Sequence, residues 1–187
     1  KPESFEIISN GTFEYRAALW DYWQSENSSA KMDFSSGAFV VSGGLRGIDE
    51  FTICLGKLRL DLPKYSIYNL TFDASSTDAS DVLRVGLQSI SDYINEEGEN
   101  IPFWSWADFS LSTKTAAYAA VLITSEFGGT EASLIFPLGL CKGAITIDNV
   151  SLVRTGTWKP EESEMVYNGD FELGSNYWNT YSEVYKA

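Results

Sequence analysis

Short apolar runs, most of them bounded by Gly, Pro, Asp or Ser, recur along about the first 150 residues of the chain. The runs that suit β-strands are residues 38–41, 51–55, 67–74, 82–88, 119–124, 132–136 and 144–148. Convincing helical periodicity is absent; the one stretch with some helical character, residues 113–120, is short and leads directly into a strand. Short strands separated by turn residues predict an all-β fold, an antiparallel β-sandwich of the jelly-roll type.

Alternation within two of these runs assigns side chains to opposite faces of the predicted sheets. In residues 67–74 the apolar positions face the core, and Asn69, Thr71 and Asp73 face outward. In residues 82–88 the outward positions are Arg84, Gly86 and Gln88. Such a row of hydrogen-bonding side chains is either a solvated surface or a binding surface, and alternation alone leaves both open.

A motif near the start of the chain recurs near its end. Residues 9–14 read Ser-Asn-Gly-Thr-Phe-Glu and residues 167–172 read Tyr-Asn-Gly-Asp-Phe-Glu, 158 positions further on. The same offset carries Trp20 onto Trp178 and Trp23 onto Tyr181. The repeat predicts a complete module at residues 5–154, a linker at 155–164, and the truncated start of a second, similar module at 165–187. The alternative is a C-terminal strand with accidental similarity.

Charge and composition exclude several classes of function. The chain has 13 basic and 26 acidic residues, a net charge of −13, which argues against binding to nucleic acid or to an anionic membrane. No apolar run approaches the roughly 20 residues of a membrane-spanning helix. The chain contains no histidine, so mechanisms that need an imidazole are excluded. Chemistry by carboxylates, or binding by aromatic and amide groups and hard cations, remains open.

The two cysteines and the first residues bear on where the protein works. Cys54 and Cys141 are too far apart in sequence for a CxxC site; they form one disulfide in a secreted protein or are two buried apolar residues. The chain opens Lys1-Pro2-Glu3-Ser4 without a signal-peptide pattern. We therefore expect a mature or excised segment.

The aromatic content, 14% of the residues, exceeds what the core of one domain usually requires. Aromatic rings can stack on the C–H faces of sugars, while amide, carboxylate and guanidinium groups bind the hydroxyls at the ring edge. Of Trp20 and Trp23, we expect one in the core and the other exposed. Trp104 and Trp106 fall in a predicted long loop, residues 92–108, and we expect Trp106 to cap the open end of the sandwich.

Three segments together carry a resemblance to known proteins. They are Asn10-Gly11-Thr12-Phe13-Glu14 followed by Trp20, then Phe136-Pro137-Leu138-Gly139, and Ile145-Thr146-Ile147-Asp148-Asn149-Val150-Ser151-Leu152. The combination resembles carbohydrate-binding module families 4, 9, 16 and 22 over essentially all of residues 5–154. The resemblance implies a jelly-roll module of a secreted polysaccharide hydrolase, and hence a non-catalytic, extracellular, polysaccharide-binding protein.

The resemblance to family 4 also implies binding residues. In that family an aromatic residue three positions after the first-strand Trp stacks on the sugar, and Trp23 holds this position. Arg84 and Tyr93 match an Arg on a middle strand and a Tyr about ten residues later, with Gln88 between them. The family tends to place amide side chains where this chain has Ile135 and Pro137, which predicts a less polar groove floor.

These observations predict a monomer that holds a single β-glycan chain, a β-1,4- or β-1,3-glucan or a xylan, in a groove on the concave face. The expected carbohydrate-binding residues are Trp23, Tyr93, Arg84, Gln88, Asn69, Trp104 and Trp106.

A structural Ca²⁺ is also implied by the resemblance. In this superfamily the Glu of the first motif and the Asp of the closing motif commonly bind Ca²⁺ together with backbone carbonyls; Glu14 and Asp148 match, and Thr12 would offer its carbonyl. Hard oxygen ligands suit Ca²⁺ and would hold the first and last strands together. Without the resemblance both would be ordinary surface carboxylates.

Two other classes remain as alternatives. A small jelly-roll glycosidase has a comparable length but needs two opposed carboxylic acids, and Asp73 is the one acid we expect on the groove face. A cell-surface adhesion module would have the same fold and a protein or cell-wall partner.

Overall fold

A computed structural model describes residues 5–26, 28–43, 49–89, 93–94, 100–101, 104–124 and 129–157. Its elements are β1 (Phe5–Glu6), β2 (Asp21–Gln24), β3 (Lys31–Asp33), β4 (Phe39–Ser42), the 3-10 turn η1 (Glu50–Thr52), β5 (Ile53–Leu62), β6 (Ser66–Ser76), β7 (Val82–Ser89), β8 (Tyr93–Ile94), β9 (Asn100–Ile101), β10 (Trp104–Ser110), β11 (Ala116–Ile123), β12 (Gly129–Pro137) and β13 (Ile145–Thr157). Within these ranges no helix is long and apolar enough to cross a membrane.

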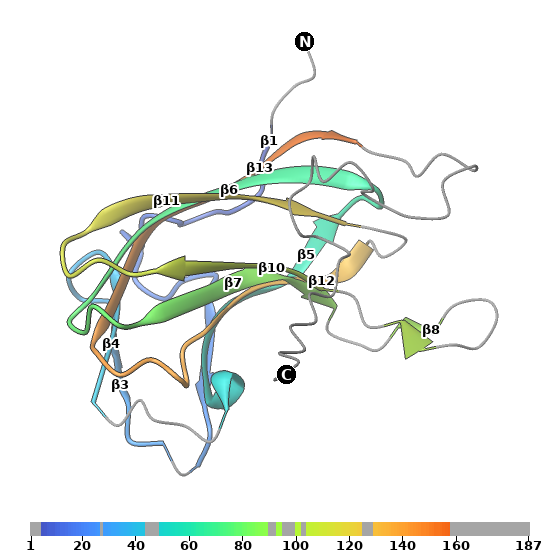
Figure 1. Cartoon of the computed structure of the whole chain (residues 1–187). Coiled ribbons are helices and arrows are strands. Elements are labelled where there is room, and N and C mark those ends of the chain that lie inside the picture. The colour runs from blue at the N-terminus through green and yellow to red at the C-terminus, as the bar shows by residue number, and fades with distance from the viewer. Residues whose placement is uncertain are drawn as a thin grey trace, which may run out of the picture.

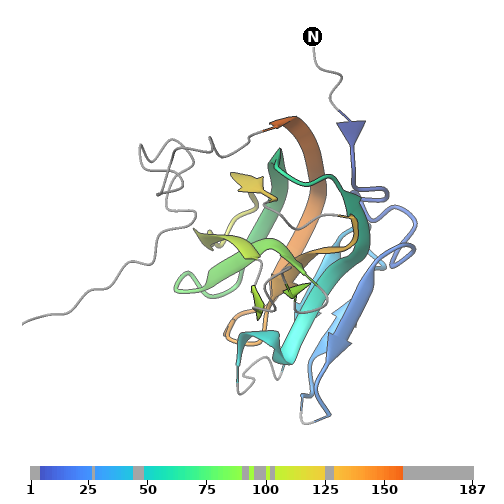
Figure 2. The same cartoon turned by 90° about the vertical axis from the view of Figure 1, so that its right-hand side faces the viewer.

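The strands form two antiparallel sheets packed face to face, as Figure 1 shows from the side and Figure 2 after a quarter turn. One sheet has the order β10-β7-β12-β5-β2. The other has the order β11-β6-β13-β4-β3, with β1 added along β13. β8 and β9 pair separately as a two-stranded ribbon. The predicted antiparallel β-sandwich of the jelly-roll type is confirmed.

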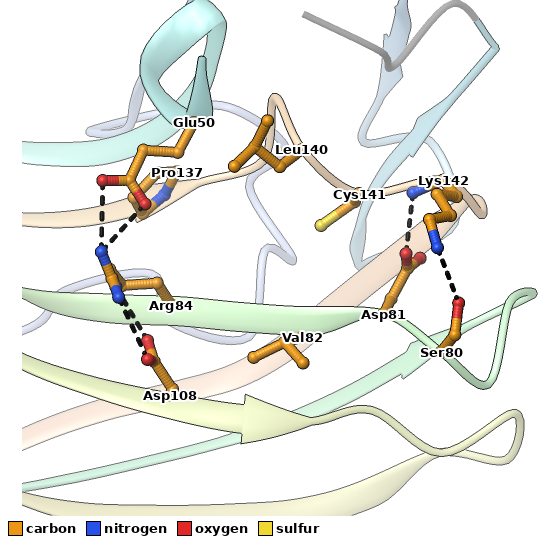
Figure 3. Close-up of a pocket in the computed structure, with 10 residues that line it drawn as sticks. All are labelled: Glu50, Ser80, Asp81, Val82, Arg84, Asp108, Pro137, Leu140, Cys141 and Lys142. Atoms are coloured by element: carbon orange, nitrogen blue, oxygen red, sulfur yellow. Dashed lines mark hydrogen bonds and ion pairs between the residues drawn. The ribbon is translucent and has the colours of Figure 1, made fainter. Parts of the chain in front are cut away.

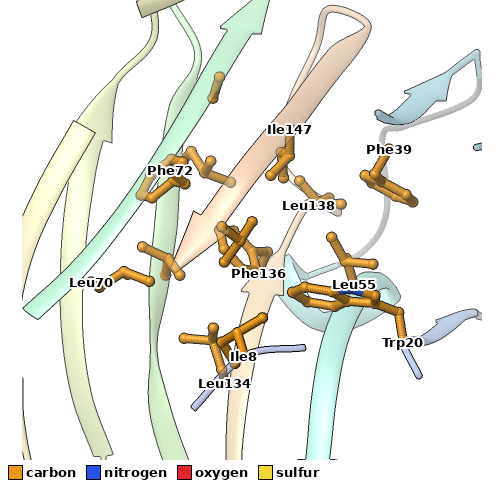
Figure 4. Packing of buried hydrophobic residues seen from close by; sticks show 14 of the residues in the cluster. Ile8, Trp20, Phe39, Leu55, Leu70, Phe72, Leu134, Phe136, Leu138 and Ile147 are labelled. Atoms are coloured by element: carbon orange, nitrogen blue, oxygen red, sulfur yellow. The ribbon is translucent and has the colours of Figure 1, made fainter. Parts of the chain in front are cut away.

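Buried side chains from both sheets meet in a single core, shown in Figure 4. Phe72 on β6 and Phe136 on β12 pack edge-to-face across the sandwich, with ring centroids 5.5 Å apart. Phe72 lies in the alternating pattern of residues 67–74, and Phe136 lies in the apolar run 132–136, which is buried throughout. Burial of this apolar surface is the main stabilising contribution to the fold.

Several predicted element boundaries were wrong. Residues 104–110 form strand β10, although residues 92–108 were predicted as a loop, and Phe51 and Thr52 belong to η1 instead of a strand. The stretch with helical character enters β11 at Ala116. β13 continues to Thr157 and pairs there with Ser66, so the first three residues of the expected linker, 155–157, belong to the sandwich.

Asn10 organises the turns that connect β1 to β2. Its side-chain amide donates to the carbonyls of Arg16 (3.0 Å) and Ala18 (2.8 Å), and its side-chain oxygen accepts from the Tyr15 amide (3.1 Å). Its own carbonyl accepts from the Trp20 indole N–H at 2.9 Å. Asn10 also has a left-handed backbone, φ 58°, which Asn tolerates better than most residues. The Asn of the repeated motif is therefore a structural residue.

Gly11 joins this loop to the last strand. Its carbonyl accepts a hydrogen bond from the Val150 amide at 2.9 Å, and a Cβ at Gly11 would lie only 1.8 Å from the Val150 carbonyl oxygen. Nearby, the Glu6 carboxylate accepts from the Ile8 amide at 2.8 Å and the Leu152 amide at 3.0 Å. The first motif thus closes the sandwich against β13, and only glycine fits at position 11.

Both cysteines are buried and free. Cys54 lies on β5 and Cys141 in the turn before β13. Burial, with smaller contributions from nearby acidic groups, raises the pKa of each thiol to about 12. Of the two alternatives left open by the sequence, the structure has the buried apolar residues and not the disulfide.

Candidate functional site

Three tryptophans lie on the outer face of the five-stranded sheet. Trp104 pairs with Gln88, and Trp106 pairs with Gly86, so both side chains share a face with the outward residues of β7. Trp23 on the edge strand β2 pairs with Cys54 and lies at the opposite side of the same sheet. We call the outward surface of β2, β5, β12, β7 and β10, with its three indoles, the indole face.

Two glycines in strand interiors make room for two of these rings. A Cβ added to Gly56 would lie 3.1 Å from a ring carbon of Trp23, and one added to Gly86 would lie 2.6 Å from a ring carbon of Trp106. Ile135 pairs with Gly56 on one side and with Gly86 on the other, and is fully buried. The indoles therefore lie close against the sheet on either side of Ile135. A glycine inside a strand commonly marks such a close approach.

Exposure separates Trp20 from Trp23 as the sequence predicted. Trp20 is 6% exposed and packs against Phe13 in the core, with ring centroids 5.0 Å apart. Trp23 is 37% exposed on the indole face. Trp106 does not cap the open end of the sandwich; it lies over Gly86 on the sheet because β10 is a strand and not a loop.

Phe51 adds a fourth ring that the sequence analysis missed. It is exposed on η1 and its ring centroid lies 6.1 Å from that of Trp106. Asp49 caps this turn, accepting from the Phe51 amide at 2.8 Å, and its own amide donates to the Thr52 hydroxyl at 3.2 Å. The Asp-x-x-Thr spacing is a capping-box signal that would have marked a turn start in the sequence.

Arg84 is held between two carboxylates on the indole face, as Figure 3 shows. Its Nε and one terminal nitrogen donate to the two oxygens of Asp108, at 2.8 and 3.1 Å, and the other terminal nitrogen donates to Glu50 at 3.2 Å. The hydrogen bond to Asp108, with smaller contributions from both negative charges, raises the pKa of Arg84. The guanidinium links η1 to β10 and has few donors left for a ligand.

The remaining predicted binding residues are not all on this face. Gln88 is, facing outward opposite Trp104. Asn69 does not lie on the indole face, because it is exposed on β6 of the other sheet, on the far side of the sandwich. The half-buried Asp73 faces outward on the same strand. Alternation separates inside from outside but does not tell which sheet a strand joins, so the predicted grouping of Asn69 with Arg84 was wrong. Tyr93 pairs through its backbone with Ile101, and its side chain lies outside the described residues.

The residues predicted to bind Ca²⁺ come from the two ends of the module's sequence, which the bond between the Val150 amide and the Gly11 carbonyl brings together. Thr12 and Glu14 are exposed in the loop after β1, and Asp148 is half-buried on β13, where it pairs with Asp73. Burial, followed by the negative charges of Asp73 and Glu14, raises the pKa of Asp148. The described residues contain no group of three or more acidic or thiol side chains placed to hold a metal ion, so a cation here would depend on backbone carbonyls.

The fold is the one found in carbohydrate-binding modules of families 4, 16 and 22. A structure described as that of a family 4 module has a TM-score of 0.58 and 19% identity, and covers 79% of this chain and 99% of its own. The second N-terminal cellulose-binding domain of Cellulomonas fimi β-1,4-glucanase C also reaches 0.58 at 19% identity, covering 83% and 97%. The CBM22-1 xylan-binding domain of Xyn10C from Paenibacillus barcinonensis gives 0.58 at 11% identity, covering 84% and 99%.

Sequence comparisons add nothing to this. No family model matches the chain, and no curated protein matches it either. At the identities above, the structural likeness establishes a shared fold.

Proposed function

We propose that this protein binds polysaccharide without cleaving it, and that the indole face is the binding surface. The observation that supports this most is the pair of indoles, Trp23 and Trp106, that lie against glycines on either side of Ile135. Trp104 and Phe51 extend the same exposed aromatic surface. Rings held against a sheet offer planar surfaces for the C–H faces of sugars, each contributing about 0.5–1.5 kcal/mol beyond area burial.

The ligand we propose is a single β-glycan chain of the glucan or xylan type. Two neighbours in fold carry the descriptions cellulose-binding and xylan-binding. Gln88, at the Trp104 end of the face, supplies an amide for sugar hydroxyls. A few stacked rings with several hydrogen bonds that compete with water correspond to a Kd between about 1 mM and 1 μM.

A glycosidase is the less suitable alternative. Glu50 and Asp108 lie close together at this face, but both accept hydrogen bonds from the one guanidinium of Arg84. Glycoside hydrolysis needs one carboxylic acid that donates a proton to the leaving oxygen. Carboxylates held by Arg84 suit a different role, as acceptors for sugar hydroxyls. Release of reducing sugar from xylan or barley glucan by the purified protein would favour the enzyme instead.

A structural Ca²⁺ near Asp148 is part of the proposal. The support is the position of Asp148 on β13 opposite Asp73 on β6, with Glu14 near enough for its charge to act on Asp148, because a cation would offset the repulsion among these carboxylates. Asp148, Glu14 and the Thr12 carbonyl would hold the ion, which would add its binding free energy to the stability of the sandwich. We also propose that the module works outside the cell, attached to a hydrolase, with a second module beginning in residues 165–187.

Replacement of Trp23 tests the proposed function. In affinity electrophoresis through soluble xylan or β-glucan, the Trp23→Ala variant should lose the retardation shown by the wild type, with nearly the same melting temperature. The control is Tyr15→Ala, an exposed aromatic on the loop after β1 that should leave retardation unchanged. Equal retardation of the Trp23 variant would remove this residue from the site. Failure of the wild type to bind any of a broad glycan panel would favour an adhesion module.

A further inference from the structure

Beyond Arg84, strand β7 leads away from the indoles to a pocket of about 280 Å³. Its walls come from the start of β7, from η1, from β10 and from the turn after β12. One end is the Arg84 guanidinium with Glu50 and Asp108. At the other end, Lys142 donates to the Ser80 hydroxyl at 3.2 Å. Figure 3 shows the two polar ends with apolar side chains between them.

The apolar side chains between these ends are exposed. Val82 is 54% and Leu140 60% exposed, although both are large hydrophobic residues. They face the same pocket, with Pro137 as a buried part of its lining. Apolar walls with a few polar groups at the ends are typical of small-molecule sites. The volume of this pocket is just below the usual lower limit of about 300 Å³ for such sites. That size suits one sugar ring.

Three carboxylates line the pocket, and they differ in their ability to accept further hydrogen bonds from a ligand. Asp81 is buried and already accepts from the Ser76 hydroxyl at 2.6 Å and from the Lys142 and Gly143 amides at 2.8 and 2.9 Å. Each ionised carboxylate has about four acceptor positions. Arg84 occupies only part of those of Glu50 and Asp108, so these two can still accept bonds from hydroxyl groups.

We propose that this pocket is a subsite for one pyranose unit of a glycan whose main chain lies on the indole face. The inference rests on the proposed function. The two surfaces are continuous, because Arg84 and Gly86 are consecutive outward residues of β7 and Trp106 lies over Gly86. Val82 and Leu140 contact the C–H faces of the sugar, and Glu50 and Asp108 accept its hydroxyls. The unit is either the end ring of the chain or a single-sugar branch, which present the same chemistry.

The test removes the apolar walls and leaves the Arg84 ion pairs intact. The variant is Val82→Ser with Leu140→Ser. Its matched control is Val121→Ser with Leu19→Ser, the same residue types at 48% and 67% exposure, with Val121 on the outer face of the other sheet. Isothermal titration calorimetry would measure Kd for cellotetraose, cellohexaose, laminarihexaose, xylohexaose and a xyloglucan heptasaccharide, which is cellotetraose carrying single-xylose branches.

We expect the Kd of the pocket variant to rise at least about threefold for the linear oligosaccharides or for the branched heptasaccharide, with an unchanged melting temperature. The control variant should keep the Kd of the wild type. Weaker binding of the linear probes would place the end ring in the pocket, and weaker binding of the heptasaccharide alone would place a branch there. Identical Kd values for all probes in wild type and pocket variant would overturn the subsite. If wild-type protein binds none of the probes, the proposed function fails, and the subsite with it.

Discussion

The indole ring of Trp23 lies against Gly56, where an added Cβ would be only 3.1 Å from the ring. A glycine inside a strand usually weakens it, by roughly 0.5–1 kcal/mol relative to alanine. Here the missing side chain leaves space that an aromatic ring from the edge strand fills. A ring held in this way has little rotamer freedom to lose when a ligand stacks on it, so less entropy opposes binding.

Gly56→Ala should therefore weaken both glycan binding and the fold. The nearest atoms to the added methyl are in side chains, Ile135 at 2.9 Å and Trp23 at 3.1 Å, so Ile135 must shift and the indole must give way slightly. We expect at least about a fivefold rise in Kd for the glycan and a loss of about 1–2 kcal/mol in unfolding free energy. Calorimetric titration and urea unfolding measure the two effects.

The control for this variant is Gly156→Ala on β13, where the nearest atom to the added methyl is 3.9 Å away. It should change neither quantity appreciably. Unaltered glycan affinity in Gly56→Ala would show that the position of the Trp23 ring does not matter for binding.

Asn10→Ala should destabilise the protein strongly. It removes three side-chain hydrogen bonds within the loop after β1 and places alanine in a left-handed conformation. At about 1 kcal/mol per bond, less some replacement by water, the unfolding free energy should fall by about 2–4 kcal/mol in urea. Asn69→Ala, at an exposed position on β6, should change it by less than about 0.5 kcal/mol. Similar stabilities of the two variants would contradict the structural role of Asn10.

The buried thiols predict loss of stability in alkali. The pKa of Cys54 and Cys141 is about 12 in the folded protein against 9.0 for a free thiol, so only the unfolded chain ionises between these values. The contribution of each thiol to stability is full below pH 9 and falls as the pH rises toward 12. A Cys54→Ala, Cys141→Ala protein should show a shallower decline in melting temperature over this range.

The same burial should protect both thiols from reagents at pH 8. A thiol-specific reagent such as DTNB should label them only on unfolding, and dithiothreitol should leave the melting temperature unchanged. Rapid labelling of the folded protein would be incompatible with the buried positions of the two cysteines.

Asp148 offers a test of the proposed calcium ion. Its pKa is raised in the folded protein, so protonation is favoured there; its effect on stability is most favourable below its ordinary pKa and is lost as the pH rises through the folded value. In EGTA at neutral pH, Asp148→Asn should match or exceed the wild-type melting temperature, because it removes a charge beside Asp73 and Glu14. Asparagine retains the side-chain oxygen that accepts from the Asn149 amide.

With millimolar Ca²⁺ the order should reverse. Wild type should gain several degrees in a thermal unfolding scan and Asp148→Asn should gain little. Equal responses to Ca²⁺ in the two proteins, or no response in either, would rule out an ion bound through Asp148.

Much of the sandwich could be predicted because alternation and burial are local properties. The apolar positions from Tyr68 to Ala74 and from Leu83 to Leu87 face the core as expected, and Trp20 and Trp23 divide into buried and exposed. Strand β10 was missed because Trp104, which is exposed, and Trp106, which is half-buried, look like loop residues when the sheet beneath them is unknown. The sequence places Gly86 on the outward face of its strand. That the Trp106 ring packs over it could not be predicted, because Trp106 comes from the neighbouring strand β10.

The ionic part of the site could not be predicted because its members are far apart in the chain. Arg84 meets Glu50 and Asp108, 34 and 24 positions away, through η1 and β10, neither of which was predicted. The placement of Asn69 failed for a related reason: strands next to each other in sequence, β6 and β7, lie in different sheets. Pairing between distant strands depends on the whole topology and leaves no local pattern.

The bond between Gly11 and Val150 has a consequence for synthesis on the ribosome. The loop held by Asn10 is made first, but the strand against which it closes is made almost a whole module later. Contacts of such long range slow folding, because the intervening chain must be ordered before they form. Until Val150 has emerged, Phe13 and Trp20 have no complete core to enter, and the nascent chain carries these rings uncovered.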